Sequence, residues 1–148
     1  MSDLQSHYNA CLYHSGAALG RSLTRMAEAN FHPIQITPTM GFILMSANEA
    51  PGISITDLAT VHQLDASTIS RTVDKLASDQ FILRSGEKRL VQVFLTPKGR
   101  RKAAEALSAW EKLRLDYSLL LGESDVKALA DLVARADAVL RSNRQGWH

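Results

Sequence analysis

The sequence predicts a mainly α-helical protein that contains one small β-hairpin. Apolar residues recur at helical spacing through most of the 148-residue chain. Two short runs rich in β-branched and aromatic residues lie on either side of a glycine-containing turn, which predicts the hairpin. Hydrophobic residues make up 45% of the chain, which is enough for the core of one compact domain with extensions.

The first part of the chain predicts three helices. Residues 4–30 lack proline and space their apolar side chains at helical intervals, so we expect one long amphipathic helix there. Thr37 should cap a second, largely buried helix whose first turn holds Pro38. A proline-glycine pair should end that helix, and a short strand then precedes a third helix that opens at Thr56 and Asp57.

The next helix and the hairpin follow directly. Asp65 is placed to cap a helix over residues 66–79, whose apolar positions fall on one face. These positions are Ile69, Val73, Leu76 and Ala77. Residues 80–85 and 90–95 predict two strands, and Gly86 between them suits a turn with positive φ.

Two further helices complete the chain. Thr96 should cap another helix whose first residue is Pro97, as Thr37 and Pro38 do earlier in the chain. This helix should run until Gly122 breaks it. Its expected apolar stripe consists of Ala103, Leu107, Trp110, Leu113 and Tyr117. The last helix, over residues 123–142, repeats apolar residues at Val126, Leu129, Leu132, Val133, Ala136, Val139 and Leu140.

Positive charge is concentrated in the middle of the chain. Residues 65–102 contain nine lysines and arginines against four acids, a surplus of five positive charges, whereas the whole chain carries +2. A local basic segment on a nearly neutral protein is typical of a site for a polyanion. An ordinary solvated charged face is the alternative.

The order helix, short turn, helix, β-hairpin is that of a winged helix-turn-helix, in which the second helix enters the major groove of DNA. Five outward residues of that helix are candidate contacts: Ser67, Thr68, Ser70, Arg71 and Lys75. Their hydroxyl groups can bond a phosphate or a base. Arg71 is the best candidate for a bidentate guanine contact, and Lys75, one turn later, should meet phosphate.

The hairpin adds three basic candidates to this predicted site. Arg84 lies in its first strand, and Lys88 and Arg89 lie at its tip. A cationic tip on a two-stranded wing is the right size to reach the minor groove beside a major-groove helix. The sequence therefore predicts double-stranded DNA as the partner.

The segments "DASTISRTVDKLASDQFI" and "LTPKGR" resemble the recognition helix and the wing-to-helix junction of the MarR family of bacterial winged-helix regulators. The resemblance covers almost the whole chain and implies a homodimer on a pseudo-palindromic operator. It places N- and C-terminal dimerisation helices at residues 1–34 and 100–148, around a winged helix-turn-helix at 35–99. Repression is the commoner mode of regulation in this family.

The chain departs from the family pattern at two places. Glu87-Lys88-Arg89 stand where the family usually has an Asp-Arg-Arg signature, and the wing is several residues shorter. Gln80 occupies a position before the wing strand where the family often has glycine. The wing is therefore the part of the predicted DNA contact that departs most from the family pattern.

The resemblance also implies a switch, because family members commonly leave DNA when a small aromatic or phenolic anion binds between the dimer helices and the winged helix. Candidate lining residues are Tyr13, His14, Met40, Met45 and Trp110. The alternative is that these side chains belong to the core.

Cys11 suggests a second switch, since "CLY" resembles the cysteine region of the family's peroxide-sensing branch. The alternative is an ordinary buried cysteine.

Other functional classes find little support in the sequence. The five histidines show no ligand spacing that predicts a metal site, and no cofactor is expected. The chain has no phosphate-binding glycine loop, H-E-x-x-H or G-x-S-x-G motif, so we do not expect an enzyme. A winged helix used only for protein contacts remains an alternative. No apolar run is long enough to span a membrane, and the chain is expected to be cytoplasmic.

Overall fold

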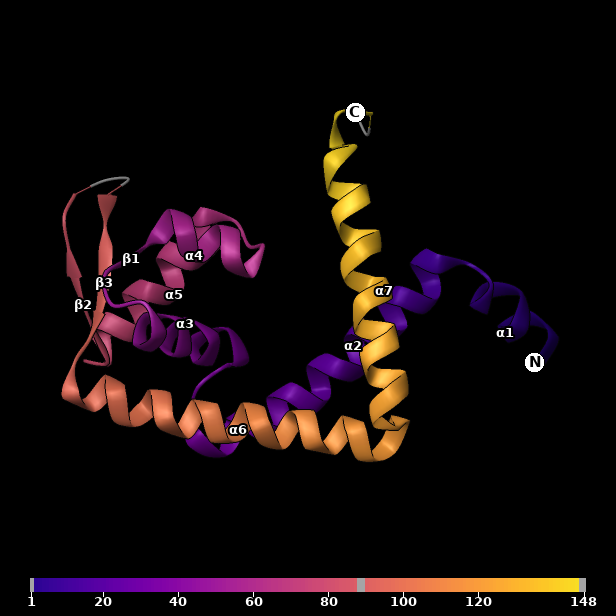
Figure 1. The fold of residues 1–148 in the computed structure, drawn as a ribbon, viewed down its shortest axis with the longest axis horizontal. Coiled ribbons are helices and arrows are strands. Elements are labelled where there is room, and N and C mark those ends of the chain that lie inside the picture. The colour runs from indigo at the N-terminus through magenta and orange to yellow at the C-terminus, as the bar shows by residue number, and fades with distance from the viewer. Residues whose placement is uncertain (1, 88–89, 147–148) are drawn as a thin grey trace. The chain divides into compact units, whose positions relative to one another are not determined.

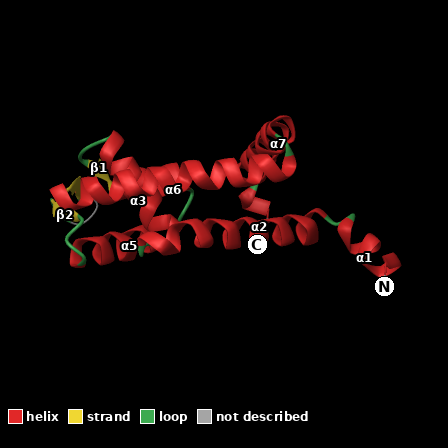
Figure 2. Ribbon diagram, turned by 90° about the horizontal axis from the view of Figure 1, so that it is seen from below, coloured by secondary structure: helices red, strands yellow, loops and turns green. Residues whose placement is uncertain are grey.

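The computed structural model describes residues 2–87 and 90–146. Its contacts divide the chain into two compact units, Met1–Glu111 and Lys112–His148. Helices make up most of the described chain, and its strands are confined to one small sheet (Figure 2). The prediction of a mainly α-helical fold with a small β element is confirmed.

The first unit holds most of the elements labelled in Figure 1. In chain order they are α1 (Ser2–Asn9), α2 (Leu12–Phe31), the 3₁₀ turn η1 (His32–Ile34), α3 (Pro38–Glu49), β1 (Ile53–Ser54), α4 (Ile55–His62), α5 (Ala66–Ser78), β2 (Ile82–Ser85), β3 (Gln92–Leu95) and most of α6 (Pro97–Leu121). The second unit holds the end of α6, then α7 (Glu123–Ser142) and the 3₁₀ turn η3 (Arg144–Gly146).

The prediction of one continuous helix over residues 4–30 is wrong, because the chain breaks between α1 and α2. Cys11 has an extended backbone, with φ −83° and ψ 117°, and its N–H donates to the carbonyl oxygen of Tyr8 at 2.9 Å. Leu12 and Tyr13 beside the break are 74% and 85% exposed. Tertiary packing therefore does not hold the helix together at this point, and Asn9 is a weak helix former.

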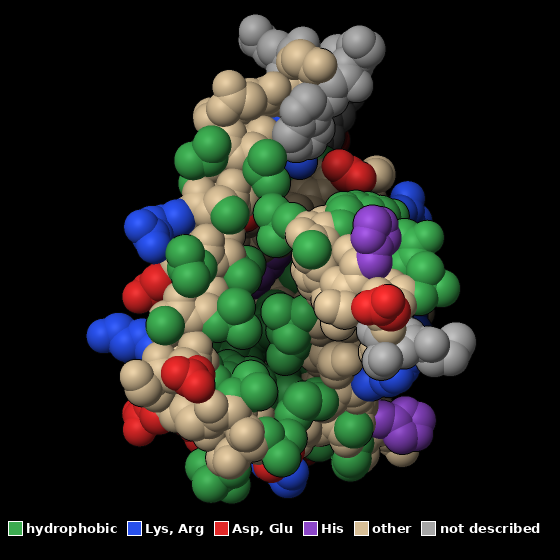
Figure 3. Space-filling view, turned by 90° about the vertical axis from the view of Figure 1, so that its right-hand side faces the viewer, with side chains coloured by type: hydrophobic (Ala, Val, Ile, Leu, Met, Phe, Trp, Pro, Cys, Tyr) green, Lys and Arg blue, Asp and Glu red, His purple; other side chains and the backbone are tan. Residues whose placement is uncertain are grey.

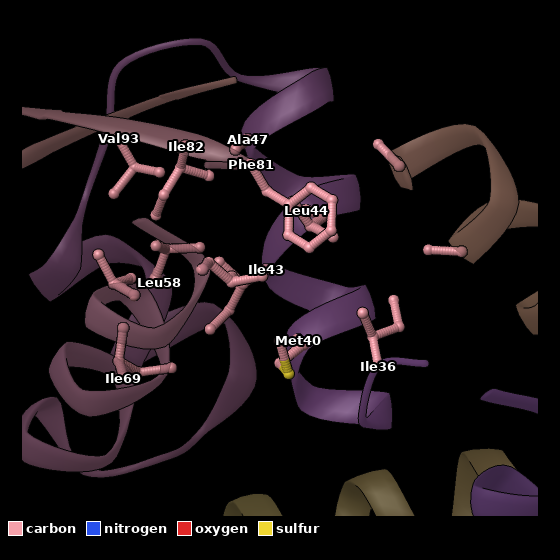
Figure 4. Close-up of a cluster of buried hydrophobic side chains, with 14 of the residues drawn as sticks. Ile36, Met40, Ile43, Leu44, Ala47, Leu58, Ile69, Phe81, Ile82 and Val93 are labelled. Atoms are coloured by element: carbon pink, nitrogen blue, oxygen red, sulfur yellow. The ribbon is translucent and has the colours of Figure 1, made fainter. Parts of the chain in front are cut away.

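Helix α3 forms the centre of the hydrophobic core, as its apolar sequence predicted. The Thr37 hydroxyl accepts a hydrogen bond from the N–H of Met40 at 3.2 Å, and Pro38 is the first helical residue. Ile43 and Leu44 are completely buried, and Figure 4 shows them among side chains from neighbouring elements. The predicted cap and the predicted burial are both confirmed.

The two helices after α3 differ in how they begin. Helix α4 starts at Ile55, one residue earlier than predicted, because the Ser54 hydroxyl accepts a hydrogen bond from the N–H of Asp57 at 3.0 Å. Asp65 is the N-cap residue of α5, as predicted, although its side chain makes no capping hydrogen bond.

A three-stranded antiparallel sheet, in the order β1-β3-β2, packs beside these helices (Figure 1). Ile53 pairs with Val93 and Ile82 pairs with Leu95. Strands β2 and β3 are each two residues shorter than predicted, because both begin two residues later. Gly86 after β2 has φ +94°, as the turn prediction required.

The start of α6 is fixed against the end of α5. The Thr96 hydroxyl accepts a hydrogen bond from the N–H of Gly99 at 2.9 Å and donates to the carbonyl oxygen of Gln80 at 2.7 Å. A Cβ on Gly99 would lie 1.8 Å from the carbonyl oxygen of Phe81, so only glycine allows this close approach. The predicted helix start at Pro97 is confirmed.

The predicted apolar stripe of α6 is only partly correct. Ala103 and Leu113 are buried, but Leu107 is 44% exposed. The small side chains of Ala106 and Ala109 take the buried positions instead. Alanine lets the helix backbone approach the core closely, which leaves the larger neighbouring side chain outside.

Helix α7 in the second unit begins after Gly122, whose φ of +90° ends α6 as predicted. The structure describes every residue of α7, and none of them is buried. Its exposed apolar side chains include Leu129, Leu132, Val133, Val139 and Leu140. Figure 3 shows exposed hydrophobic side chains gathered on one face of the molecule.

Candidate DNA-binding surface

The helix-turn-helix is formed by α4, a short turn and α5. Gln63 ends α4 in the left-handed region, with φ +55°, which turns the chain away from the helix axis. Asp65 then returns to extended backbone before α5 begins. The turn needs only Gln63, Leu64 and Asp65, so the two helices lie close together along the chain.

Helix α5 has two distinct faces. Ile69, Val73 and Leu76 are completely buried, as their spacing predicted. Ser67 and Arg71 are exposed at the front of the helix. The structure therefore presents the N-terminal half of the predicted recognition helix to solvent and anchors its opposite side in the core.

Thr68 and Ser70 are half-buried rather than fully outward. The Thr68 hydroxyl accepts a hydrogen bond from Nη2 of Arg71 at 3.4 Å, a distance at which such a bond is weak. This contact keeps the guanidinium group near the front of α5 and costs little to break. Arg71 is thus positioned for an external acceptor.

Two of the predicted DNA contacts also form ion pairs within the chain. Nζ of Lys75 lies 3.0 Å from a carboxylate oxygen of Asp79, one turn further along α5. Arg84 in β2 donates to the carboxylate of Asp74, which joins the wing to α5. Sequence reasoning missed both pairs, although the four-residue spacing of the first was visible.

The basic surplus of the sequence overstates the charge available to DNA. Lys98 donates to the carbonyl oxygen of Asp79 at 2.9 Å and lies 4.7 Å from the centre of the Phe81 ring. Lys102 donates to the carbonyl oxygen of Ile34 at 3.0 Å. Lys98 thus joins α6 to the chain just after α5, and Lys102 joins α6 to η1. The predicted wing contacts Lys88 and Arg89 lie outside the described residues.

The structure separates the four principal effector candidates. Met40 is buried in the core, and Tyr13 and His14 are exposed near the start of α2. Trp110 is half-buried and lines a groove on the first unit together with Met45.

The groove at Trp110 is formed by three helices, α3, α4 and α6. Its lining residues are Phe42, Met45, Ser46, Glu49, His62, Leu107 and Trp110. Sequence reasoning named Met45 and Trp110 but missed Ser46 and His62, whose side chains are hydrogen bonded at 2.9 Å. No spacing rule brings residues from three separate helices together.

Cys11 is exposed at the N-cap position of α2, so the expectation of an ordinary buried cysteine is wrong. Within the described part of the chain, no group of three His, Cys, Asp or Glu residues is placed to hold a metal ion. The described helices also include none that is long and apolar enough to cross a membrane.

Comparison with known proteins agrees with this architecture. The family model of the MarR family matches residues 36–89, which include the helix-turn-helix and the first strand of the wing, β2. No curated protein matches the chain significantly.

Three similar solved structures illustrate the likeness. The transcriptional repressor CouR bound to p-coumaroyl-CoA is 26% identical, with 82% of this chain and 90% of that chain covered and a TM-score of 0.71. A MarR variant from Escherichia coli complexed with operator DNA is 22% identical. The match covers 87% of this chain and 96% of that chain, with a TM-score of 0.76. BpsR from Bordetella bronchiseptica, whose structure concerns regulation of DNA binding by 6-hydroxynicotinic acid, is 17% identical. The match covers 88% of this chain and 96% of that chain, with a TM-score of 0.80.

The fold and the exposed helix define a winged helix-turn-helix protein with additional helices on both sides. The family match and the similarity to these structures then identify the group within that class. Residues 36–89 form a MarR-family domain, and the chain as a whole has the fold of solved MarR-family regulators.

Proposed function

We propose that the protein is a sequence-specific DNA-binding transcription regulator that acts as a homodimer. In this proposal it is a repressor that a small aromatic or phenolic effector releases from a pseudo-palindromic operator. The observation that carries the proposal is the exposed front of α5, where Ser67 and Arg71 face solvent while the opposite side is buried.

The same architecture occurs in a structure that contains operator DNA, that of the Escherichia coli MarR variant. By analogy, α5 enters the major groove, where Arg71 bonds a guanine edge and Ser67 approaches a phosphate or base. Thr68, Ser70 and Lys75 are proposed as supporting contacts. Arg84 would orient the wing through Asp74, and Lys88 and Arg89 would extend towards the minor groove.

The proposed homodimer accounts for apolar surface that the single chain leaves exposed. Helix α7 buries none of its residues, and Leu12 and Tyr13 are also largely exposed. A symmetric partner would cover residues of both terminal regions, 1–34 and 100–148. Two copies would then present two α5 helices to the two halves of a palindromic site.

The proposed effector is supported by the relatives and by the groove. CouR was solved with p-coumaroyl-CoA, and the BpsR structure concerns 6-hydroxynicotinic acid. In this chain, the aromatic and apolar lining around Met45 and Trp110 suits a flat molecule.

The test is binding of the purified protein to DNA from upstream of its own gene, measured by fluorescence anisotropy over a salt series. A specific complex should weaken steeply with salt, because neutralised phosphates release counterions, and should exceed binding to random DNA. Arg71→Ala should cost about 1–3 kcal/mol on the cognate site and relax base preference at one position in each half-site.

Arg21→Ala is the matched control, since it removes an exposed arginine from α2, outside the winged helix. An equal loss on cognate and random DNA would reassign Arg71 to phosphate contact. Salt-insensitive or absent binding by reduced, ligand-stripped protein to DNA from this region and from a genomic library would reject the proposal.

One alternative is a regulator that responds to peroxide through Cys11, whose thiol is exposed in the single chain. Under that alternative, an organic peroxide releases the wild-type protein from DNA, and Cys11→Ser abolishes the release. Unchanged release from the Cys11→Ser variant would end the alternative while leaving the DNA-binding proposal intact.

A further inference from the structure

The groove on the first unit has a polar end and an apolar body. Residues Phe42, Met45, Ser46 and Glu49 come from α3, His62 is the last residue of α4, and Leu107 and Trp110 come from α6. All of them lie within residues 1–111, so one compact unit forms the groove.

The apolar body of the groove suits a flat ring. Phe42 and Trp110 are aromatic, and Met45 and Leu107 add flexible apolar surface. The Phe42 ring already stacks on the imidazole of His62, with centroids 6.0 Å apart and an interplanar angle of 23°. A planar ligand can extend this kind of packing along the groove.

The polar end is a hydrogen-bonded pair of side chains. Oγ of Ser46 and Nε2 of His62 are 2.9 Å apart. A hydroxyl and a neutral imidazole can each donate or accept, so the pair can adapt to a ligand's donor or acceptor. Desolvation by burial lowers the pKa of His62 below its ordinary value of 6.5 and so favours the neutral form of the ring.

The charge around the groove disfavours an anion. Among its lining residues none is lysine or arginine, and the single acid is Glu49. A ligand carboxylate that entered here would lose hydration without gaining a cationic partner. Glu49 would also repel it.

We propose that this groove binds a planar aromatic ligand without negative charge, whose polar substituent hydrogen bonds the Ser46–His62 pair. The inference rests on the proposed function, because it assigns the effector site, and it restricts the small aromatic or phenolic effector to molecules that are neutral or cationic. The pair joins α3 to α4, and both of these helices pack against the recognition helix α5. Occupancy of the groove thus acts on the elements that hold α5.

Two probes of nearly the same shape test the charge preference, para-hydroxybenzamide and para-hydroxybenzoate. Each is titrated into the full-length protein by isothermal titration calorimetry near neutral pH, with no DNA present. We expect the amide to bind at least about tenfold more tightly than the carboxylate, because only the carboxylate is repelled by Glu49 and left without a cation.

Variants of the lining then locate the binding. Ser46→Ala and His62→Gln should each weaken amide binding several-fold, and His62→Gln retains a side chain that can hydrogen bond Ser46. Glu49→Gln should improve carboxylate binding and narrow the difference between the probes. Glu49 is exposed, so this variant leaves the core unchanged. Glu28→Gln, at an exposed glutamate of α2, is the control and should change neither affinity.

Equal or tighter binding of the carboxylate would overturn the proposal. So would amide binding that Ser46→Ala and His62→Gln leave unchanged, or absence of binding by both probes at millimolar concentration. Because the titration contains no DNA, these outcomes are separate from failure of the anisotropy experiment. Failure of the ligand-free protein to bind DNA, combined with amide binding that depends on Ser46 and His62, would reject the regulator but not the ligand site.

Discussion

Helices α3 and α7 are both rich in apolar residues, but only α3 buries them within the single chain. Five of the twelve residues of α3 are buried, including Ile43 and Leu44, whereas none of the twenty residues of α7 is. An apolar helix face is buried only when a complementary surface is present. The single chain supplies that surface for α3, and we propose that a second copy supplies it for α7.

The comparison is tested most strongly by placing charges on the apolar face of α7. Leu132 and Val139 lie seven residues apart, on one side of the helix, and are 56% and 62% exposed. Leu132→Glu with Val139→Glu should raise the Kd of the homodimer about a thousandfold, equivalent to about 4 kcal/mol, because unpaired charges would be buried at the interface. Sedimentation velocity over a protein concentration series measures this.

Lys127→Glu provides the control for the α7 variant, since it changes charge on the opposite, polar side of the same helix. It should leave the sedimentation coefficient unchanged. A double variant that remains as dimeric as the wild type would show that α7 does not form the interface.

A pair of matched leucine substitutions compares the two helices directly. Leu44 in α3 is 0% exposed, so Leu44→Ala should lower the free energy of unfolding by about 2–5 kcal/mol through lost burial and the cavity it leaves. Leu132→Ala in α7 should lower it by an amount that depends on protein concentration, because the lost contact lies between copies. Urea denaturation at two protein concentrations separates the two effects.

The difference between the helices would disappear if Leu132→Ala shifted the urea midpoint equally at both concentrations. That result would place the partner surface of Leu132 within its own chain. A small effect of Leu44→Ala would instead mean that the core relaxes around the missing side chain.

Local sequence signals predicted the starts of α3 and α6 well. Thr37 and Thr96 cap these helices through their own hydroxyl groups, so the information lies within four residues. The buried face of α5 was equally predictable, because the spacing of Ile69, Val73 and Leu76 fixes which side meets the core.

Features that depend on distant residues could not be predicted in the same way. The break at Cys11 follows from missing tertiary contacts, which no local pattern records. Arg84 meets Asp74 only because β2 lies against α5, ten residues away along the chain. The Ser46–His62 pair at the candidate ligand groove likewise needs two helices to meet.

Gln80 provides the smallest test, because it concerns backbone strain within the well-packed unit. Its backbone, between α5 and β2, has φ +63°, a conformation that favours glycine. Gln80→Gly should raise the free energy of unfolding by about 0.5–1 kcal/mol. Glycine relieves the backbone strain of the folded state, and this gain is partly offset because glycine also increases the conformational entropy of the unfolded chain. Thermal or urea denaturation measures the change.

Gln92→Gly is the natural counterpart, since Gln92 is exposed in the extended strand β3 and glycine there weakens a strand. The two substitutions remove the same side chain but should shift stability in opposite directions. If both destabilise the protein, Gln80 contributes more through its side chain than its backbone strain costs. The Gln80 side chain would then stabilise the first unit even though the backbone conformation of this residue is unfavourable.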